Sequence, residues 1–329
     1  MRLFFLSLIF FTSATCAAQT LQTVYKETGI SLRGLSVVSD SVVWASGSNG
    51  TVVRSIDGGQ TWKKLPLAGY ERMDFRDIEA FDSSTAVILA IAEPAYVLRT
   101  SNGGASWQLV YENHTPGVFL DAMDFRNEQE GIIVGDPIDG KFLITRSIDG
   151  GISWTDLPPS QRPTADSGEA CFASSGTNIR WNGGQAMFVS GGTSTHLFKQ
   201  DKKIVLPIAQ KSPTSGANSM AVNENVILVA GGDFTSPESS EANSCYSLDG
   251  GLTWQLPVTP PRGYRSCVEH LRGNQWITCG LNGVDISVDN GRNWNSISTE
   301  SFHAVRKAKK GNAVFFSGNG GRIAKLIPN

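Results

Sequence analysis

The sequence is poor in charge and in the residues that most often carry out chemistry. Only 18% of its 329 residues are charged, and 28 basic residues nearly balance 30 acidic ones. Such a chain has no global field to attract nucleic acid or an anionic membrane, so we expect neither as a partner. It also lacks a G-x-S-x-G nucleophile elbow, a P-loop and any flavin or quinone fingerprint. Its histidines, 114, 196, 270 and 303, are too dispersed for a spaced zinc motif. We therefore expect no metal and no cofactor.

Long hydrophobic runs are absent beyond the first twenty residues, MRLFFLSLIFFTSATCAAQT. That segment has one early positive charge, an apolar run too short to span a bilayer, and small residues before Gln19. It predicts a secretory signal peptide over residues 1–18, cleaved after Ala18. The alternative is a lipoprotein signal that uses Cys16, although no aliphatic residue stands three positions before that cysteine. We expect one domain over residues 19–329, exported to a periplasmic or extracellular compartment, monomeric and without a transmembrane segment.

Cysteine is scarce, and glycine is abundant. Removal of the signal leaves Cys171, Cys245, Cys267 and Cys279. The last two flank an expected hairpin turn near Gly273, so they face each other; a disulfide and two free buried thiols both fit this spacing. The 35 glycines favour many tight turns between short buried strands, hence a β-rich protein.

An octapeptide recurs along the chain. SIDGGQTW at 55, TSNGGASW at 100, SIDGGISW at 147, SLDGGLTW at 247 and SVDNGRNW at 287 share one frame. Their tryptophans are separated by 45, 47, 100 and 40 residues, so the wide gap leaves room for one unit without the motif. That unit is AMFVSGGTSTHLFKQDKKIVLPI. A fixed period of this length is typical of propellers and solenoids.

Each octapeptide follows a strand, a turn and a second strand, as in VVWASGSNGTVVRS. The final unit, AVFFSGNGGRIAKL, stops after three strands, and the segment LQTVYKE near the N-terminus is an unassigned strand. Pairing these two removes an open edge. The sequence thus predicts an all-β, seven-bladed β-propeller of four-stranded antiparallel blades, with the last blade closed by the N-terminal strand.

The octapeptide itself has two readings, a calcium loop and a turn. A calcium loop needs several converging carboxylates, whereas each copy offers one acidic side chain and the second copy has Asn102 instead. A turn needs only an Asp or Asn, glycines with positive φ and a hydroxyl, followed by a packed Trp. We favour the turn. Its key residues are Asp57, Asn102, Asp149, Asp249 and Asp289, with Trp62, Trp107, Trp154, Trp254 and Trp294.

The octapeptides resemble the Asp box, S-x-D-x-G-x-T-W, of sialidase-like propellers and the BNR-repeat superfamily. Over the mature chain, the units look most like the exported YCF48/HCF136-type propellers, named for photosystem II assembly factors. This resemblance implies a seven-bladed, non-enzymatic assembly or interaction factor. Nothing in the residues argues for photosynthesis, so only partner binding carries over.

Strand order predicts where the partner binds. The octapeptides join the third strand of a blade to the fourth, so they lie on the face opposite the starts of the innermost strands. The longer loops gather on the face where the innermost strands start, and such loops commonly carry binding sites. Aligning those starts gives one ring of Arg33, Arg76, Leu120, Gly168, Ala217, Arg265 and His303, and a second of Gly34, Asp77, Asp121, Glu169, Asn218, Ser266 and Ala304. Tyr264, Asp136 and Asp233 are expected beside them.

Three readings of these rings remain open. A wet channel simply tolerates facing charges that neutralise one another. Clustered arginines also suit a carboxylate-bearing ligand or peptide. The third is a sialidase-like hydrolase of a carboxylated sugar, with Tyr264 as nucleophile, Glu169 as its partner and Asp77 or Asp121 as acid; the F/Y-R-I-P motif of sialidases is missing. We favour a protein-binding propeller that uses the face opposite the octapeptides.

Overall fold

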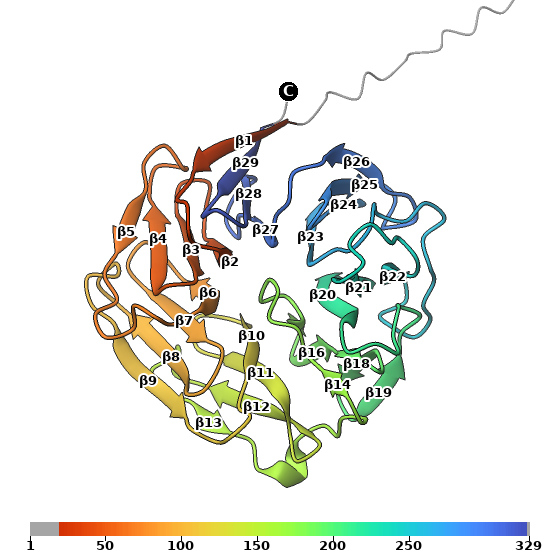
Figure 1. The fold of residues 1–329 in the computed structure, drawn as a ribbon, viewed down its shortest axis with the longest axis horizontal. Helices are drawn as coiled ribbons and strands as arrows, with labels where there is room; N and C mark the ends of the chain where they lie inside the picture. The colour runs from red at the N-terminus through yellow and green to blue at the C-terminus, as the bar shows by residue number, and fades with distance from the viewer. Residues whose placement is uncertain (1–19, 328–329) are drawn as a thin grey trace, which may run out of the picture.

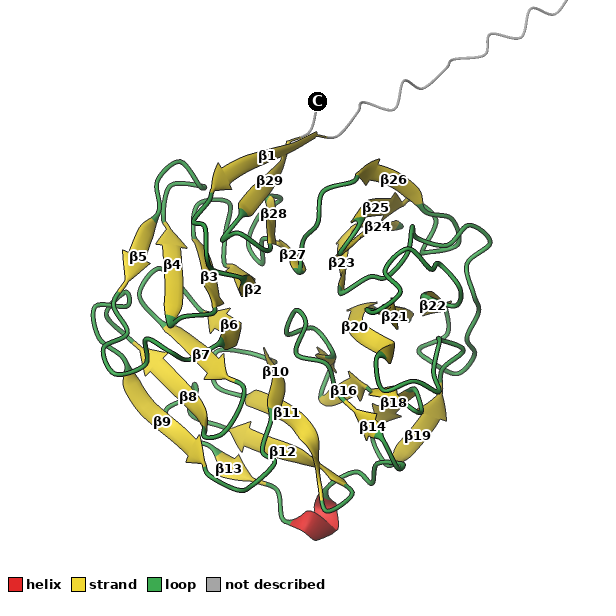
Figure 2. Ribbon diagram, in the orientation of Figure 1, coloured by secondary structure: helices red, strands yellow, loops and turns green. Residues whose placement is uncertain are grey.

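A computed structural model describes residues 20–327, so the predicted signal peptide lies outside the described residues. Seven antiparallel sheets are arranged around a central axis (Figure 1). Almost all regular structure within residues 20–327 is strand, and the one short 3-10 helix of that range, η1 (Pro159–Gln161), lies at the periphery (Figure 2). The prediction of an all-β, seven-bladed propeller is confirmed. No helix among residues 20–327 is long and apolar enough to cross a membrane.

The first three blades are regular four-stranded meanders. Blade one contains β2 (Leu32–Val37), β3 (Val43–Gly47), β4 (Thr51–Ser55) and β5 (Lys63–Leu65). Blade two contains β6 (Phe75–Ala80), β7 (Ala86–Ala90), β8 (Ala95–Thr100) and β9 (Gln108–Asn113). Blade three contains β10 (Leu120–Phe125), β11 (Gly131–Ile138), β12 (Lys141–Ser147) and β13 (Thr155–Asp156).

The next three blades include the irregular part of the ring. Blade four contains β15 (Ile179–Asn182), β16 (Gln185–Val189), β18 (His196–Lys199) and β19 (Lys202–Val205). Blade five contains β20 (Ser215–Asn223), β21 (Val226–Asp233) and β22 (Ser244–Ser247), and its fourth strand is reduced to a bridge between Tyr246 and Gln255. Blade six contains β23 (Cys267–Arg272), β24 (Gln275–Gly280), β25 (Gly283–Ser287) and β26 (Asn295–Ser298).

The last blade is closed by both ends of the chain. It contains β27 (Ala304–Lys307), β28 (Val314–Ser317) and β29 (Ile323–Ile327), and its outermost strand is β1 (Thr20–Tyr25). β1 pairs antiparallel with β29, from Thr20 opposite Ile327 to Tyr25 opposite Ile323. Figure 1 shows the two strands side by side at the edge of the ring. The predicted closure by the N-terminal strand is therefore confirmed.

Blade four corrects one alignment made from the sequence. Its innermost strand begins near Ile179 instead of at Gly168. Glu169 is the first residue of β14 (Glu169–Ala170), and Gly168 directly precedes it. This strand pairs with β17 (Gly191–Gly192) and extends the sheet of blade five. The alignment failed because the chain inserts an additional segment, residues 171–178, before the innermost strand.

The five octapeptide loops form closed hydrogen-bonded turns. In the first, Asp57 Oδ1 accepts from Ser55 Oγ at 2.8 Å and from Thr61 N at 2.9 Å, and Trp62 Nε1 donates to Gly59 O at 3.2 Å. The backbone N–H of the fourth octapeptide residue also donates to the loop between the first two strands of its blade, as Gly58 N does to Ser41 O. These contacts use the polar groups internally, which supports the interpretation as a turn. They also place the loops at the end of the ring where the innermost strands finish.

Two faces are defined by this arrangement. The top face is the one at which the innermost strands begin, and the bottom face carries the octapeptide loops. Between blades, the core is filled by apolar side chains from adjacent sheets. At the seam of blades three and four, for example, the rings of Phe188 and Phe198 stack at 4.5 Å and Phe142 packs edge-on against both. Rigid seams of this kind hold the channel-lining residues in fixed positions.

Candidate functional site

The innermost strands carry a β-bulge where they enter the channel. Register shifts fall at Arg33, Arg76, Asp121 and Asn218, each between the first residues of its strand. A bulge leaves one residue unpaired and re-aims its side chain. This irregularity explains why polar residues recur at this position of otherwise apolar strands.

A cavity of about 450 Å³ opens between these strands at the top face. Seven of the predicted residues line it, namely Arg33, Arg76, Asp136, Asn218, Tyr264, Ser266 and His303. Most of the remaining wall is apolar, with Phe119, Phe172, Phe234 and Leu281 as its large side chains. We call this the top cavity. A groove of about 660 Å³ between blades two and three adjoins it and shares Phe119 and Asp136.

The two arginines of the top cavity differ in their partners. Arg76 Nε donates to Asp74 Oδ2 at 2.8 Å, and its guanidinium lies 6.0 Å from the centre of the Phe119 ring. Arg33 has only a long contact, 3.4 Å from Nη1 to Ser174 O, and no carboxylate of residues 20–327 lies within 4.0 Å of it. Burial and the neighbouring Arg76 lower the pKa of Arg33. An incoming anion would relieve this desolvated charge.

His303 contributes less positive charge than the sequence suggested, whereas Asp136 stays largely ionised at physiological pH. His303 Nε2 lies 3.0 Å from Ser31 Oγ and 2.9 Å from Asn319 Oδ1. Burial and Arg33 lower the pKa of His303 to about 3, so the imidazole is neutral. Burial raises the pKa of Asp136 to about 6, while Cys171 N donates to its carboxylate at 2.9 Å. The positive charge of the top cavity at physiological pH is therefore carried by Arg33 and Arg76.

Arg265 is absent from the cavity, contrary to prediction. Its side chain is fully buried within blade six and forms an ion pair with Asp285, with further bonds to Asn282 Oδ1 at 2.6 Å and Tyr264 O at 2.9 Å. A buried carboxylate two strands away offers a stronger partner than the open channel. The sequence alignment gave its position but not the direction of its side chain.

The four residues considered for hydrolysis are not brought together. Only Tyr264 lines the top cavity, and its hydroxyl donates to Asn218 Oδ1 at 2.9 Å instead of to a carboxylate base. Asp77 and Asp121 are buried deeper, and burial together with Asp136 raises the pKa of Asp121 well above its usual range. Asp233, which was expected near the mouth, accepts from Thr235 N at 2.9 Å within its own turn.

Glu169 belongs to a separate cluster beside blade four. His196 Nδ1 lies 2.8 Å from its carboxylate, and Lys203 Nζ lies 2.8 Å from Glu169 and 2.7 Å from Asp166. Ligand atoms of Asp166, Glu169 and His196 all lie within 4.8 Å of one another. The ammonium of Lys203 already supplies a cation to both carboxylates, which does not fit a metal ion there.

Residues 173–177 cross the channel below the top cavity, and we call them the plug. Figure 1 shows this green loop projecting toward the centre of the ring. Ser175 Oγ donates to Ser266 O of blade six at 2.7 Å, and Thr177 Oγ1 bonds Ser219 Oγ of blade five at 2.6 Å. Arg306 of blade seven donates to Ser175 O and Gly176 O, both at 3.3 Å. The plug thus forms the floor of the top cavity and ties several blades together.

A second cavity, of about 350 Å³, lies at the bottom face. Its inner wall is formed by six side chains of the innermost strands, Ser36, Glu79, Asp124, Arg180, Glu269 and Arg306. Sequence reasoning missed this cavity. Side chains two apart share a face of a strand, but two positions beyond the predicted second ring lie only Ser36, Glu79 and Arg306 of these six.

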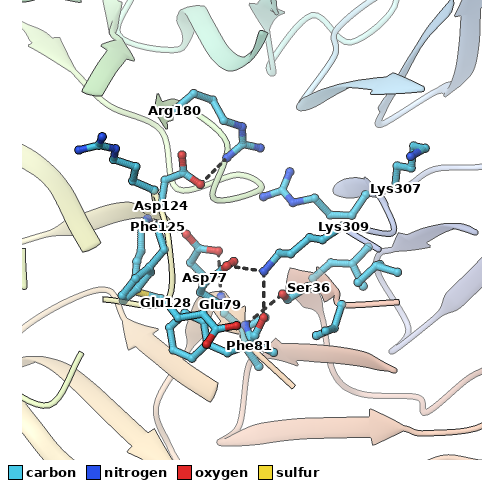
Figure 3. Close-up of a pocket in the computed structure, with 18 of the residues that line it drawn as sticks. Ser36, Asp77, Glu79, Phe81, Asp124, Phe125, Glu128, Arg180, Lys307 and Lys309 are labelled. Carbon is cyan, nitrogen blue, oxygen red and sulfur yellow. Dashed lines mark hydrogen bonds and ion pairs between the residues drawn. The ribbon is translucent and has the colours of Figure 1, made fainter. Parts of the chain in front are cut away.

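This second cavity, which we call the bottom cavity, is rich in charges of both signs. Figure 3 shows Arg180 facing Asp124 and Lys309 reaching to Glu79, with Asp77 between them. Arg180 Nη1 and Asp124 Oδ1 lie 3.7 Å apart, and Lys309 forms an ion pair with Glu79. Burial raises the pKa of Asp77 to about 7 and also raises that of Asp124 and Glu269.

Cys267 and Cys279 lie near the channel wall. They face each other as register partners in β23 and β24, as the sequence predicted, and both are buried free thiols in this structure. The hydrogen bond with Cys279 and the Arg306 guanidinium lower the pKa of Cys267 well below its usual range, although burial opposes this. Cys171 and Cys245 are also buried and free.

The fold and the two cavities define the class: a seven-bladed propeller whose channel is divided by a plug. The photosystem II assembly lipoprotein Ycf48 of Prochlorococcus marinus is 39% identical over 62 residues. That match spans 17% of this chain and 18% of the relative, so it concerns about a fifth of either protein. No family model matches the chain.

Solved structures show the same fold over nearly the whole chain. The structure described as YCF48 bound to D1 peptide has a TM-score of 0.67 at 16% identity, covering 95% of this chain and 97% of that one. YCF48 from Cyanidioschyzon merolae gives 0.66 at 15% identity, covering 93% and 98%. The WD40 propeller of Doa1 gives 0.63 at 13% identity, covering 97% and 98%. The predicted resemblance to YCF48-type propellers is thus confirmed at the level of the fold.

Proposed function

We propose that this protein is a non-enzymatic interaction factor that binds a protein partner through its top face. The observation that carries the proposal is the top cavity, where Arg33 is desolvated, has no carboxylate partner within residues 20–327, and stands beside apolar walls. A planar guanidinium in that position suits a carboxylate, which it can hold through two parallel hydrogen bonds.

The shape of the site favours an extended segment of the partner. The groove between blades two and three leads into the top cavity and shares two wall residues with it. An extended chain lying in this groove would place an acidic side chain or a terminal carboxylate beside Arg33, with apolar neighbours against Phe119 or Phe234. The related YCF48 structure is described as bound to a D1 peptide, which supports a peptide ligand for this fold.

We also propose that the mature protein acts as an exported monomer. The predicted signal peptide supports export, and the Ycf48 relative from Prochlorococcus marinus is named a lipoprotein. Cleavage after Ala18 and lipid attachment at Cys16 are distinguished by the mass of the mature N-terminal peptide. The sialidase-like alternative gains no support, because Tyr264, Glu169 and the two aspartates do not line one cavity.

The proposal is tested with peptides that end in a free or an amidated carboxyl group. Partners captured from the exported fraction supply the sequences, and binding of each peptide pair is measured by calorimetry. We expect Arg33→Ala to weaken binding of the free-carboxyl form about 10- to 100-fold, since a hydrogen bond to a charged group contributes about 1.5–3 kcal/mol.

Arg76→Ala should weaken the same binding, whereas the exposed bottom-face Arg126→Ala should leave it unchanged. Full retention of binding in both top-cavity variants refutes the pocket. Turnover of carboxylated glycosides by the wild-type protein would instead establish the enzyme alternative.

A further inference from the structure

The bottom cavity is independent of the proposed partner site. The plug separates the two, because Ala173 and Ser174 line the top cavity while Arg306, which lines the bottom cavity, donates to the carbonyls of Ser175 and Gly176. Its volume of about 350 Å³ suits a small molecule and is too little for a folded partner.

The deep part of the bottom cavity offers hydrogen-bond acceptors beside two guanidiniums that are already partly engaged. Arg306 donates to Cys267 Sγ and to two plug carbonyls, and Arg180 donates to Ile179 O and faces Asp124. The carboxylate of Glu269 receives only a 3.5 Å contact from Lys307 N, and no cation of residues 20–327 lies within 4.0 Å of it.

Carboxyls outnumber guanidiniums at this depth. Asp77, Asp124 and Glu269 stand around two arginines, and each carboxylate oxygen can accept a further bond. Burial raises the pKa of all three, because desolvation disfavours their ionised forms, and a cation beside them would offset that cost. A cation placed among them is stabilised by every one.

The outer part of the cavity carries more positive than negative charge, with Glu128 as its exposed carboxylate. Lys309 and Lys310 are exposed and Lys307 is half-buried, and all three line the opening. Lys307 and Lys309 have partners, Gly311 O and Glu79 respectively, while Lys310 has no side-chain partner among residues 20–327. The net charge therefore changes from negative in the depth to positive at the opening, where the lysines outnumber Glu128.

We propose that the bottom cavity binds a small zwitterion of the amino acid class, with its ammonium group beside Glu269 and its carboxylate beside Lys310. This polarity excludes two simpler ligands. A diamine would place its second cation against the lysines, and a dicarboxylate would place its second anion against Glu269 and Asp124.

Calorimetry with the purified protein tests the proposal, using γ-aminobutyrate, lysine, putrescine and glutarate as probes. We expect binding of γ-aminobutyrate or lysine, at least tenfold weaker binding of putrescine and glutarate, and at least tenfold weakening by Glu269→Gln. The exposed Glu241→Gln is the matched control and should change nothing. Lys310→Gln, at an exposed position, should weaken γ-aminobutyrate and strengthen putrescine, because it removes a cation that faces the second ammonium of the diamine.

Three results would overturn the proposal. The first is the absence of heat with both zwitterions, and the second is putrescine or glutarate binding as tightly as γ-aminobutyrate. The third is an unchanged dissociation constant in both Glu269→Gln and Lys310→Gln. None of these results bears on the peptide assay of the top cavity, so the two proposals fail separately.

Discussion

Replacing Arg265 by leucine should destabilise the fold without touching the top cavity. The guanidinium and the Asp285 carboxylate are both almost fully buried and form an ion pair. Removing one partner leaves a buried charge with only Arg262 N, at 3.2 Å, as a remaining donor. Breaking a buried pair in this way costs about 3–5 kcal/mol.

The expected change can be measured as a shift in melting temperature. With an unfolding entropy of about 2.1 cal/mol/K per residue, a chain of 329 residues should lose about 1.5 °C per kcal/mol. Arg265→Leu should therefore melt about 4–8 °C below the wild type. The double variant Arg265→Leu/Asp285→Leu should recover much of this loss, because well-packed apolar side chains can replace a buried pair.

Arg33→Leu is the matched control. Its guanidinium has no carboxylate partner among the described residues, so the same substitution should leave the melting temperature unchanged or raise it, while peptide binding falls. A melting temperature for Arg265→Leu equal to that of the wild type would show that the pair does not stabilise the fold. If Arg265→Leu lost peptide binding but kept its melting temperature, Arg265 would instead belong to the binding surface.

Two further predictions concern the plug and Asp77. Gly176 has φ +64°, and an added Cβ would lie 2.2 Å from Asp77 Cγ, so Gly176→Ala should lower the free energy of unfolding by about 1–3 kcal/mol in urea titrations. Gly183→Ala, with φ +59° but nothing within 4 Å, should cost less; equal losses would mean that backbone strain alone matters. Because the folded-state pKa of Asp77 is raised to about 7 from 3.8, its stabilising contribution is complete below pH 3.8 and is lost as pH rises through 7. Asp77→Asn should therefore gain stability relative to the wild type between pH 4 and pH 8, and parallel pH profiles would contradict the raised pKa.

The repeated octapeptides made the fold predictable from the sequence, whereas the irregular blade four limited the prediction of the site. Five octapeptides at a regular spacing fixed the blade boundaries, and the three-stranded end of the chain revealed the role of the N-terminal strand. Glu169 was misplaced because the plug is an insertion without a counterpart in the other blades. Arg265 was misjudged because side-chain direction depends on Asp285, a partner that lies 20 residues further along the chain.

The closure of the ring has a consequence for how the protein folds. The outermost strand of the last blade is the first described strand of the chain, and its partner, β29, is the last. Six blades can pair from neighbouring segments during synthesis, but the seventh must wait until the whole chain has left the ribosome. Contacts between such distant segments form slowly because the entropy of closing a long loop is lost first. Until then, β1 and β29 are two unpaired edges, so a chaperone that shields strand edges would act on this protein at its two ends.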